Sequence, residues 1–262
     1  MTQNNSKMSK WIESLDPEMI SVILPTYKRP VFLERALSSL AEQRNPPKFE
    51  VIVVDDGSPK PNMIKDIVES YVDVMNMDIK LIELEENSGT VSIPRNIGIS
   101  HISGLYISPM DDDCFAEPDK LNYLYMALTR QRKGWAPIAF GNRRELAKLD
   151  GEYVFQKLKT VNSSTQDPRA VGLDNGQFIY SAEIYIAIKP CLAINACDWE
   201  LYKQIPDIGG NFVFVNEIVC NYVWHGGNIS LTPKPLRKNP ADIIQNFKQY
   251  FKEGAFKDEV YA

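Results

Sequence analysis

The stretch Leu105-Tyr-Ile-Ser-Pro-Met-Asp-Asp-Asp113 is the most informative part of this 262-residue chain. Its apolar first half predicts a buried strand, and three carboxylates follow at the carboxyl end of that strand. Side chains alternate in an extended segment, so Asp111 and Asp113 point the same way, with alpha carbons roughly 6.5–7 Å apart. Like charges at this spacing favour a bound divalent cation or a raised pKa. A solvated acidic turn is the alternative, but open α/β sheets bind ligands at this end of a strand.

Strand and helix patterns alternate upstream and downstream of this stretch. Residues 49–54 are apolar except for Glu50 and show no alternation of polar and apolar residues, which is typical of a parallel strand covered on both faces. Apolar side chains at helical spacing follow Pro30, a proline that fits the first turn of a helix. The predicted strands are 19–24, 49–54, 79–84 and 105–110, and the predicted helices begin at Pro30, near Ile64, near Ser92 and at Pro118. This order predicts an α/β fold: a Rossmann-like, mostly parallel central sheet with helices on both faces.

The second half of the chain predicts a smaller region of mixed structure. The strand candidates there are 136–140, 177–180, 212–215 and 218–224, with a short helix at 197–205, a long polar loop at 161–176 and a terminal helix over 243–251. We therefore divide the chain into a tail or peripheral helix (1–18), a first half (19–134), a second half of the same domain (135–230) and a helical tail (231–262).

Composition and charge narrow the class of protein. An apolar content of 44% is enough for a substantial core, and no apolar run has the length of a membrane span. The net charge of −5 argues against nucleic-acid binding, which needs a clustered basic surface. The polar start lacks the core of a secretory signal. Cys114, Cys191, Cys197 and Cys220 form no CxxC pair and no zinc spacing, so we expect reduced thiols that pack in a cytoplasmic protein. The oligomeric state is not readable from the sequence.

Four polar segments lie at or just beyond the carboxyl ends of the predicted strands. They are 25–29, 55–58, Gly89 with 95–98, and 111–113. In a parallel sheet these ends share one edge, so residues far apart in sequence line one crevice. Their combination and order resemble the family 2 glycosyltransferases of the GT-A fold, which move a sugar from a nucleoside diphosphate to an acceptor hydroxyl. The resemblance covers about residues 19–230. It implies that 19–134 is the nucleotide-sugar-binding half and that 135–230 is the acceptor-binding and catalytic half of the same domain.

This resemblance implies the residues that bind the donor. Pro25, Thr26 and Tyr27 would cup the nucleotide base, Asp55 would accept a hydrogen bond from a ring N–H of uracil or guanine, and Arg95 would lie beside the nucleotide. Arg29 and Asp56 are placed in the same binding set, although Asp56 also suits a plain turn and Arg95 a helix surface. The acidic triplet matches the family's DxD signature.

The resemblance also implies a metal site and a catalytic base. Asp111 would face the ribose, while Asp113, or Asp112 in its place, would hold Mn²⁺ or Mg²⁺ against the diphosphate. His225 would be a further metal ligand. Asp198 matches the catalytic base of the family's Glu-Asp motif, although Cys197 stands in place of the usual Glu. A helix cap is the other role for Asp198, and Glu200 is the nearest substitute base.

We predict an inverting, metal-assisted glycosyltransferase that uses a nucleotide sugar, with a UDP-sugar first among the candidates. A nucleotidyltransferase is one alternative, although the segment after the first strand lacks the glycine-rich basic loop usual in such enzymes. A non-catalytic module that binds nucleotide sugar is the other alternative, and Cys197 is the feature that favours it. The donor sugar and the acceptor are not determined by the sequence.

Overall fold

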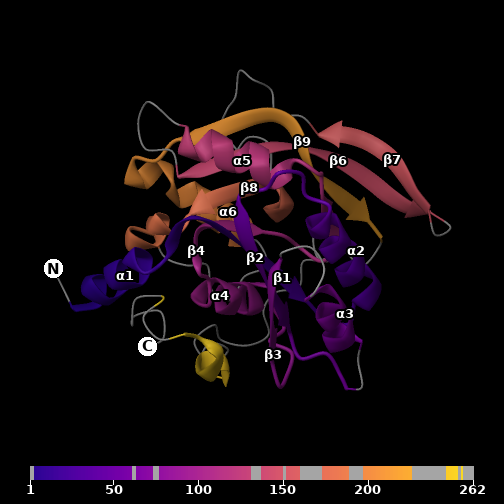
Figure 1. Ribbon diagram of the computed structural model, residues 1–262, viewed down its shortest axis with the longest axis horizontal. Helices are drawn as coiled ribbons and strands as arrows, with labels where there is room; N and C mark the ends of the chain where they lie inside the picture. Colours follow the sequence, from indigo (N-terminus) through magenta and orange to yellow (C-terminus); the bar gives the residue numbers. More distant parts are fainter. Residues whose placement is uncertain are drawn as a thin grey trace.

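A nine-stranded sheet runs through the chain in its computed structural model, with helices packed against it (Figure 1). The structure describes residues 3–60, 63–72, 77–130, 137–149, 152–159, 173–188, 197–225, 246–252 and Ala255. Within these residues the elements follow the predicted alternation of strand and helix up to the end of α5 (Lys120–Thr129).

The first half of the sheet is parallel throughout. Its strands run in the order β3 (Asp78–Glu83), β2 (Lys48–Asp55), β1 (Asp16–Thr26) and β4 (Gly104–Pro109). The order places β1 and β4 side by side, so the segments that follow them leave the sheet at the same edge. This half confirms the predicted parallel sheet.

The second half of the sheet is mixed. It continues from β4 through β8 (Phe178–Ser181), β6 (Ile138–Leu149), β9 (Phe212–Trp224) and β5 (Cys114–Ala116), while β7 (Glu152–Lys159) pairs with β6. β6 and β9 are parallel, and the other pairs in this half are antiparallel. Together the two halves form the predicted α/β sheet with its mixed region.

Two hydrophobic clusters show that helices cover both faces of the sheet. Alternate residues of β1 belong to different clusters: Ile23 packs with α1 (Gln3–Glu13) and α4 (Ser92–Ser100), whereas Val22 and Leu24 pack on the opposite face. The helices on that opposite face are α2 (Pro30–Ala41), α3 (Ile64–Tyr71) and α5. A strand buried on both faces has mostly apolar residues, which is why β1 and β2 show no alternation. Ser21 and Glu50 are buried exceptions, and the hydroxyl of Ser21 donates to the carboxylate of Glu50 at 2.6 Å.

Several predicted boundaries were wrong. β1 begins at Asp16 rather than Met19, and the preceding helix α1 buries Met8 and Trp11 in the core. The predicted strands 212–215 and 218–224 are one strand, β9. Sequence reasoning did not predict β5, β7 or the extension of β6 to Leu149. Most of the described side chains of β7 are exposed, so its residues show no apolar pattern that would mark a buried strand.

The predicted terminal helix over 243–251 lies partly outside the described residues. Its described part ends in a short 3-10 turn, Lys248–Tyr250, rather than in an α-helix. Phe247 is buried in the core, and the hydroxyl of Tyr250 accepts a hydrogen bond from the backbone N–H of Glu85 at 2.9 Å. This segment is therefore anchored on the loop that leads into α4.

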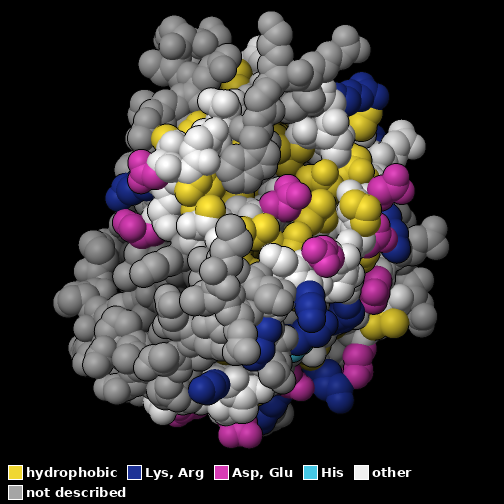
Figure 2. Space-filling view, turned by 90° about the vertical axis from the view of Figure 1, so that its left-hand side faces the viewer, with side chains coloured by type: hydrophobic (Ala, Val, Ile, Leu, Met, Phe, Trp, Pro, Cys, Tyr) yellow, Lys and Arg dark blue, Asp and Glu magenta, His cyan; other side chains and the backbone are white. Residues whose placement is uncertain are grey.

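The surface carries both signs of charge. On the face shown in Figure 2, acidic and basic side chains surround an area of hydrophobic side chains. Among the described residues, none of the helices is both long enough and apolar enough to cross a bilayer.

Candidate functional site

The carboxyl ends of β1, β2 and β4 bring the predicted site segments together. Thr26 at the end of β1 lies opposite Asp55 at the end of β2 in the sheet register. The hydroxyl of Thr26 donates to Oδ2 of Asp112 at 2.8 Å, which ties β1 to the acidic triplet that follows β4. Pro25 is buried beside Thr26, and Tyr27 is half-buried with the ammonium of Lys28 over its ring at 4.7 Å. The segments therefore meet at one edge, as the parallel order requires.

The three aspartates of the triplet have different partners. Asp111 forms an ion pair with Arg95 and accepts a hydrogen bond from the Asn175 amide at 3.3 Å. Asp112 is buried and its two oxygens accept from Thr26 and Arg29. Oδ2 of Asp113 lies 3.0 Å from Nε2 of His225 and also accepts from Arg29. The three consecutive carboxylates thus have different sets of hydrogen-bond and ion-pair partners.

Arg29 supplies the positive charge between two of these carboxylates. Its Nη1 donates to Asp112 Oδ1 at 3.0 Å and to Asp113 Oδ2 at 3.2 Å. Burial lowers the pKa of the Arg29 guanidinium, but attraction to Asp112 and Asp113 outweighs burial and leaves that pKa above its ordinary value. Burial raises the pKa of the Asp112 carboxyl to about 7, against the opposing charge of Arg29. The guanidinium of Arg29 is therefore the positive charge that compensates the carboxylates of Asp112 and Asp113 in this structure.

His225 follows the last residue of β9 and faces the acidic triplet. Besides its contact with Asp113, its ring packs on Phe32 of α2, with the ring centroids 4.7 Å apart. The side chains of His225 and Asp113 are mostly buried. The structure thus brings together the two residues predicted as metal ligands, and it places Asp113 rather than Asp112 against the histidine.

Asp55 and Asp56 differ in what surrounds their carboxylates. Oδ1 of Asp55 accepts from the backbone N–H and the hydroxyl of Ser58, and the same hydroxyl accepts from the N–H of Lys28. Both oxygens of Asp56 accept from the loop before α4, through Asn87 and Ser88. Asp56 therefore ties the segment after β2 to the loop before α4.

Sequence reasoning missed two contributors to this site, Arg35 and Asn175. Arg35 of α2 donates to the backbone oxygen of Asp113 at 2.8 Å and lies over the rings of Phe115 and Tyr153. Those rings belong to β5 and β7, the strands that were not predicted, so no signal in the sequence linked Arg35 to the triplet. Asn175 lies near the end of the predicted polar loop 161–176.

The comparison with protein families matches residues 21–187 of the chain to the model "Glycosyl transferase family 2". The match covers the parallel half of the sheet and the acidic triplet. The chain belongs to glycosyl transferase family 2. This confirms the resemblance drawn from the four polar segments.

Two curated bacterial glycosyltransferases are similar to part of this family 2 chain. It is 28% identical over 141 residues to glycosyltransferase GlyA of Streptococcus pneumoniae, a match that covers 54% of the chain and 19% of GlyA. It is 37% identical over 102 residues to the poly(ribitol-phosphate) beta-N-acetylglucosaminyltransferase TarS of Staphylococcus aureus, covering 38% of the chain and 17% of TarS. The chain therefore spans less than a fifth of either relative.

Two solved structures share the fold of this family 2 chain. S. aureus TarS 1–349 in complex with UDP-GlcNAc matches with a TM-score of 0.64 and 21% identity, covering 93% of this chain and 70% of that one. The mannosyltransferase PcManGT of Pyrobaculum calidifontis, in complex with GDP-Man and Mn²⁺, matches with a TM-score of 0.59 and 16% identity, covering 95% and 68%. These matches confirm the predicted GT-A fold.

The predicted base of this family 2 chain lies at the start of α6 (Cys197–Gln204). The side chain of Asp198 lies outside the described part of the structure. Glu200, the alternative base, forms an ion pair with Lys203 at 3.2 Å, and both side chains are about half exposed.

Proposed function

We propose that this chain is an inverting glycosyltransferase that moves a sugar from a nucleoside diphosphate, with UDP as the carrier, to an acceptor hydroxyl. The observation that supports the proposal most is the meeting of Asp113, His225 and Arg29 at the edge where β1 and β4 end, in a family 2 chain. The solved relatives support a nucleotide-sugar donor, since one holds UDP-GlcNAc and the other GDP-Man with Mn²⁺.

The donor would lie along the edge formed by the ends of β1, β2 and β4. Pro25, Thr26 and Tyr27 would pack against the base, and the carboxylate of Asp55 would accept from its ring N–H. The Arg95–Asp111 pair at the amino end of α4 would contact the ribose and the diphosphate, where backbone N–H groups favour anions. We assign donor binding to residues 19–134 and acceptor binding to residues 135–230.

Asp113 and His225 fit a divalent cation by their spacing and chemistry. Two ligands in neighbouring positions of an octahedron with bonds of about 2.1 Å lie about 3.0 Å apart. The distance between Asp113 Oδ2 and His225 Nε2 is 3.0 Å. Mn²⁺ or Mg²⁺ held there would offset the charge that develops on the departing diphosphate. Asp112 is a less suitable ligand, because both of its oxygens accept hydrogen bonds, from Thr26 and Arg29, and because His225 faces Asp113 instead. Arg29 also donates to Oδ2 of Asp113, and that hydrogen bond would have to open when the ion binds.

Asp198 is the proposed general base at the start of α6. It would take the proton of the acceptor hydroxyl as that oxygen attacks the anomeric carbon from the face opposite the leaving diphosphate, which inverts the configuration. General-base assistance of this kind typically contributes about 10²–10⁴-fold. Glu200 is the alternative base, although its ion pair with Lys203 would first have to open.

A thermal-shift panel of UDP-, GDP- and dTDP-sugars, each with and without Mn²⁺, tests the donor. We expect the largest stabilisation from a UDP-sugar together with Mn²⁺, because a ligand at 100 times its dissociation constant adds about 2.7 kcal/mol. A protein that no nucleotide sugar stabilises would contradict the proposal.

Release of UDP from the donor that binds then separates an enzyme from a binding module. We expect Asp198→Asn to bind the donor as the wild type does and to release UDP about 10²–10⁴-fold more slowly, with Glu200→Gln as the matched control. Loss of turnover in Glu200→Gln alone would move the base to Glu200. Equal binding without turnover in any of the three proteins would leave only the binding module.

A further inference from the structure

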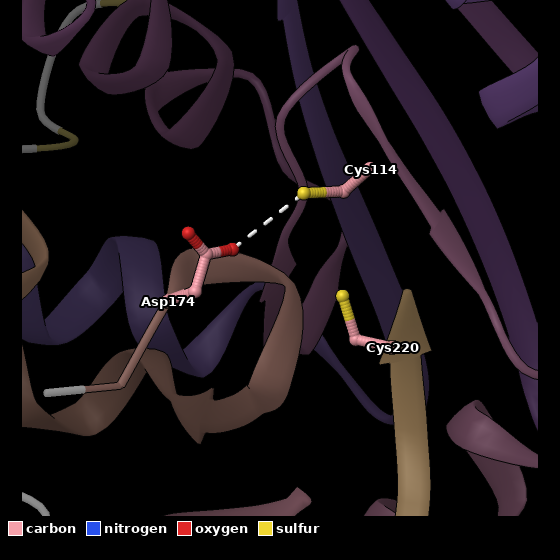
Figure 3. A group of neighbouring side chains, drawn as sticks. All are labelled: Cys114, Asp174 and Cys220. Carbon is pink, nitrogen blue, oxygen red and sulfur yellow. Dashed lines mark hydrogen bonds between the residues drawn. The ribbon is translucent and has the colours of Figure 1, made fainter. Parts of the chain in front are cut away.

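Cys114, Asp174 and Cys220 form a second cluster of ligand atoms behind the acidic triplet (Figure 3). They come from β5, from the residue that caps the 3-10 turn Asn175–Gln177, and from β9. The two sulfurs and one carboxylate oxygen all lie within 4.8 Å of one another, and Cys114 Sγ is 3.7 Å from Asp174 Oδ1. Figure 3 shows the three side chains converging on one point.

The local backbone explains why these groups meet. In the antiparallel pair of β5 and β9, Ala116 lies opposite Cys220 and Cys114 lies opposite Tyr222, so the cysteines are diagonal neighbours on one face of the sheet. Gly176 lets the turn that carries Asp174 approach, because a Cβ at position 176 would collide with the sulfur of Cys220. Both thiols are buried.

Lys120 is an independent sign that this cluster holds negative charge. Its side chain is fully buried, and its ammonium has no hydrogen-bond partner among the described residues. Burial lowers the pKa of Lys120, and the groups that act against this shift are Cys220, Cys114, Asp174 and Asp111. A buried ammonium without hydrogen bonds is costly unless anions lie near it. The carboxylates of Asp174 and Asp111 are such anions, and thiolates at Cys114 and Cys220 would add to them.

We propose that Cys114, Cys220 and Asp174 bind a structural Zn²⁺ ion, distinct from the cation at Asp113 and His225. In a tetrahedral zinc site with ligand bonds of about 2.0 to 2.3 Å, neighbouring ligand atoms are about 3.5–3.8 Å apart. The observed 3.7 Å between Cys114 Sγ and Asp174 Oδ1 already fits this geometry. Thiolate sulfur selects zinc over the manganese or magnesium that oxygen ligands prefer.

The charges of the proposed site balance. Each thiol loses its proton to solvent as its sulfur–zinc bond forms, so that the site exchanges two protons for one divalent ion. Two thiolates and one carboxylate then carry three negative charges, which Zn²⁺ and the Lys120 ammonium neutralise together. No oxidant or reductant takes part.

The position of the cluster gives the ion a structural task. Cys114 directly follows Asp113, and its sulfur lies 3.7 Å from Oδ1 of that residue. Asn175, which follows Asp174, donates to Asp111. Zinc at the cluster would therefore fix β5, β9 and the 3-10 turn to one another directly behind the acidic triplet.

Cobalt substitution tests the proposal in the 262-residue Cys191→Ser/Cys197→Ser protein, whose only thiols are Cys114 and Cys220. After treatment with a chelator, we expect one equivalent of Co²⁺ to give a thiolate-to-cobalt charge-transfer band that Zn²⁺ abolishes. The further change Cys220→Ser should remove the band, whereas His225→Ala should keep it. Absence of the band in the starting protein, or its survival in Cys220→Ser, would overturn the proposal.

Zinc X-ray absorption of the same starting protein gives a test that needs no change in the cluster. We expect two sulfur neighbours at about 2.3 Å from the zinc. A zinc shell of nitrogen and oxygen alone would contradict the proposal even if the Cys220→Ser protein failed to fold. Both readouts are independent of donor binding and turnover.

Discussion

The Nε2 atom of His225 lies 3.0 Å from Oδ2 of Asp113, although 112 residues separate them in the sequence. If these atoms share a divalent cation, His225→Ala should weaken Mn²⁺ binding at least about 10-fold. Loss of a residue that only hydrogen-bonds a metal ligand already lowers metal affinity by about 10- to 100-fold. Mn²⁺ titration followed by electron paramagnetic resonance measures this directly. His101→Ala is the matched control, because His101 is the other histidine of the chain and lies at the end of α4. Equal affinities for all three proteins would exclude His225 as a ligand.

The ion pairs of Arg29 with Asp112 and Asp113 should stabilise the metal-free protein. Arg29→Gln leaves two largely buried carboxylates without their cation, and we expect a loss of about 1–3 kcal/mol in the free energy of unfolding by urea. Arg44→Gln is the control, since its pair with Asp119 is exposed and should contribute less than about 1 kcal/mol. Mn²⁺ should then stabilise Arg29→Gln more than the wild type. Equal losses in the two variants would argue against a special role for Arg29.

Gly57 is the position where an added side chain should harm the fold most directly. Its φ angle is 70°, and a Cβ there would collide with the backbone of Glu86 and Asn87. Gly89 has a similar φ of 77° but open space around it. Gly89→Ala should therefore lower the free energy of unfolding by only about 1–2 kcal/mol, the cost of placing alanine in the left-handed region. Gly57→Ala should lower it clearly more, because the added Cβ also collides with the backbone. Urea unfolding of both variants gives the comparison, and a smaller loss in Gly57→Ala would contradict this packing of the two loops.

The buried carboxyl of Asp56 should make stability depend on pH. Burial raises its pKa from 3.8 to about 7, against hydrogen bonds from Ser88. Between these two values the folded protein keeps a proton that the unfolded chain has lost. The contribution of Asp56 to stability is therefore complete below the lower value and is lost as the pH rises towards 7, by at most about 1.4 kcal/mol per pH unit.

Urea unfolding of the wild type and Asp56→Asn at a series of pH values tests this sign. The wild type should lose stability relative to the variant across that window, and the difference between the two should become constant above about pH 8. Parallel curves throughout would show that Asp56 does not titrate in this range. Asp112 titrates in both proteins, so its effect cancels in the difference when the two sites act independently.

Local patterns in the sequence were enough for the family and for the parallel half of the sheet. The largely apolar, non-alternating runs of β1 and β2 predicted strands buried on both faces, and the polar segments after them predicted the edge at which Thr26, Asp55 and the acidic triplet meet. These features depend on residues close together in the chain, because the alternation of strand and helix fixes which ends of the strands share an edge. The roles of Asp198 and Asp113 remain predictions.

Pairings between distant strands were decided only by the tertiary structure. The exposed side chains of β7 and the three-residue β5 give no apolar pattern, so the partners of Arg35 could not be anticipated. The spacing of Cys114 and Cys220 likewise predicted packing alone, and only the register of β5 against β9 places both thiols beside Asp174. The pattern of apolar residues along a strand shows which of its faces is buried. The register between two strands depends instead on how the whole sheet packs, which a local pattern does not show.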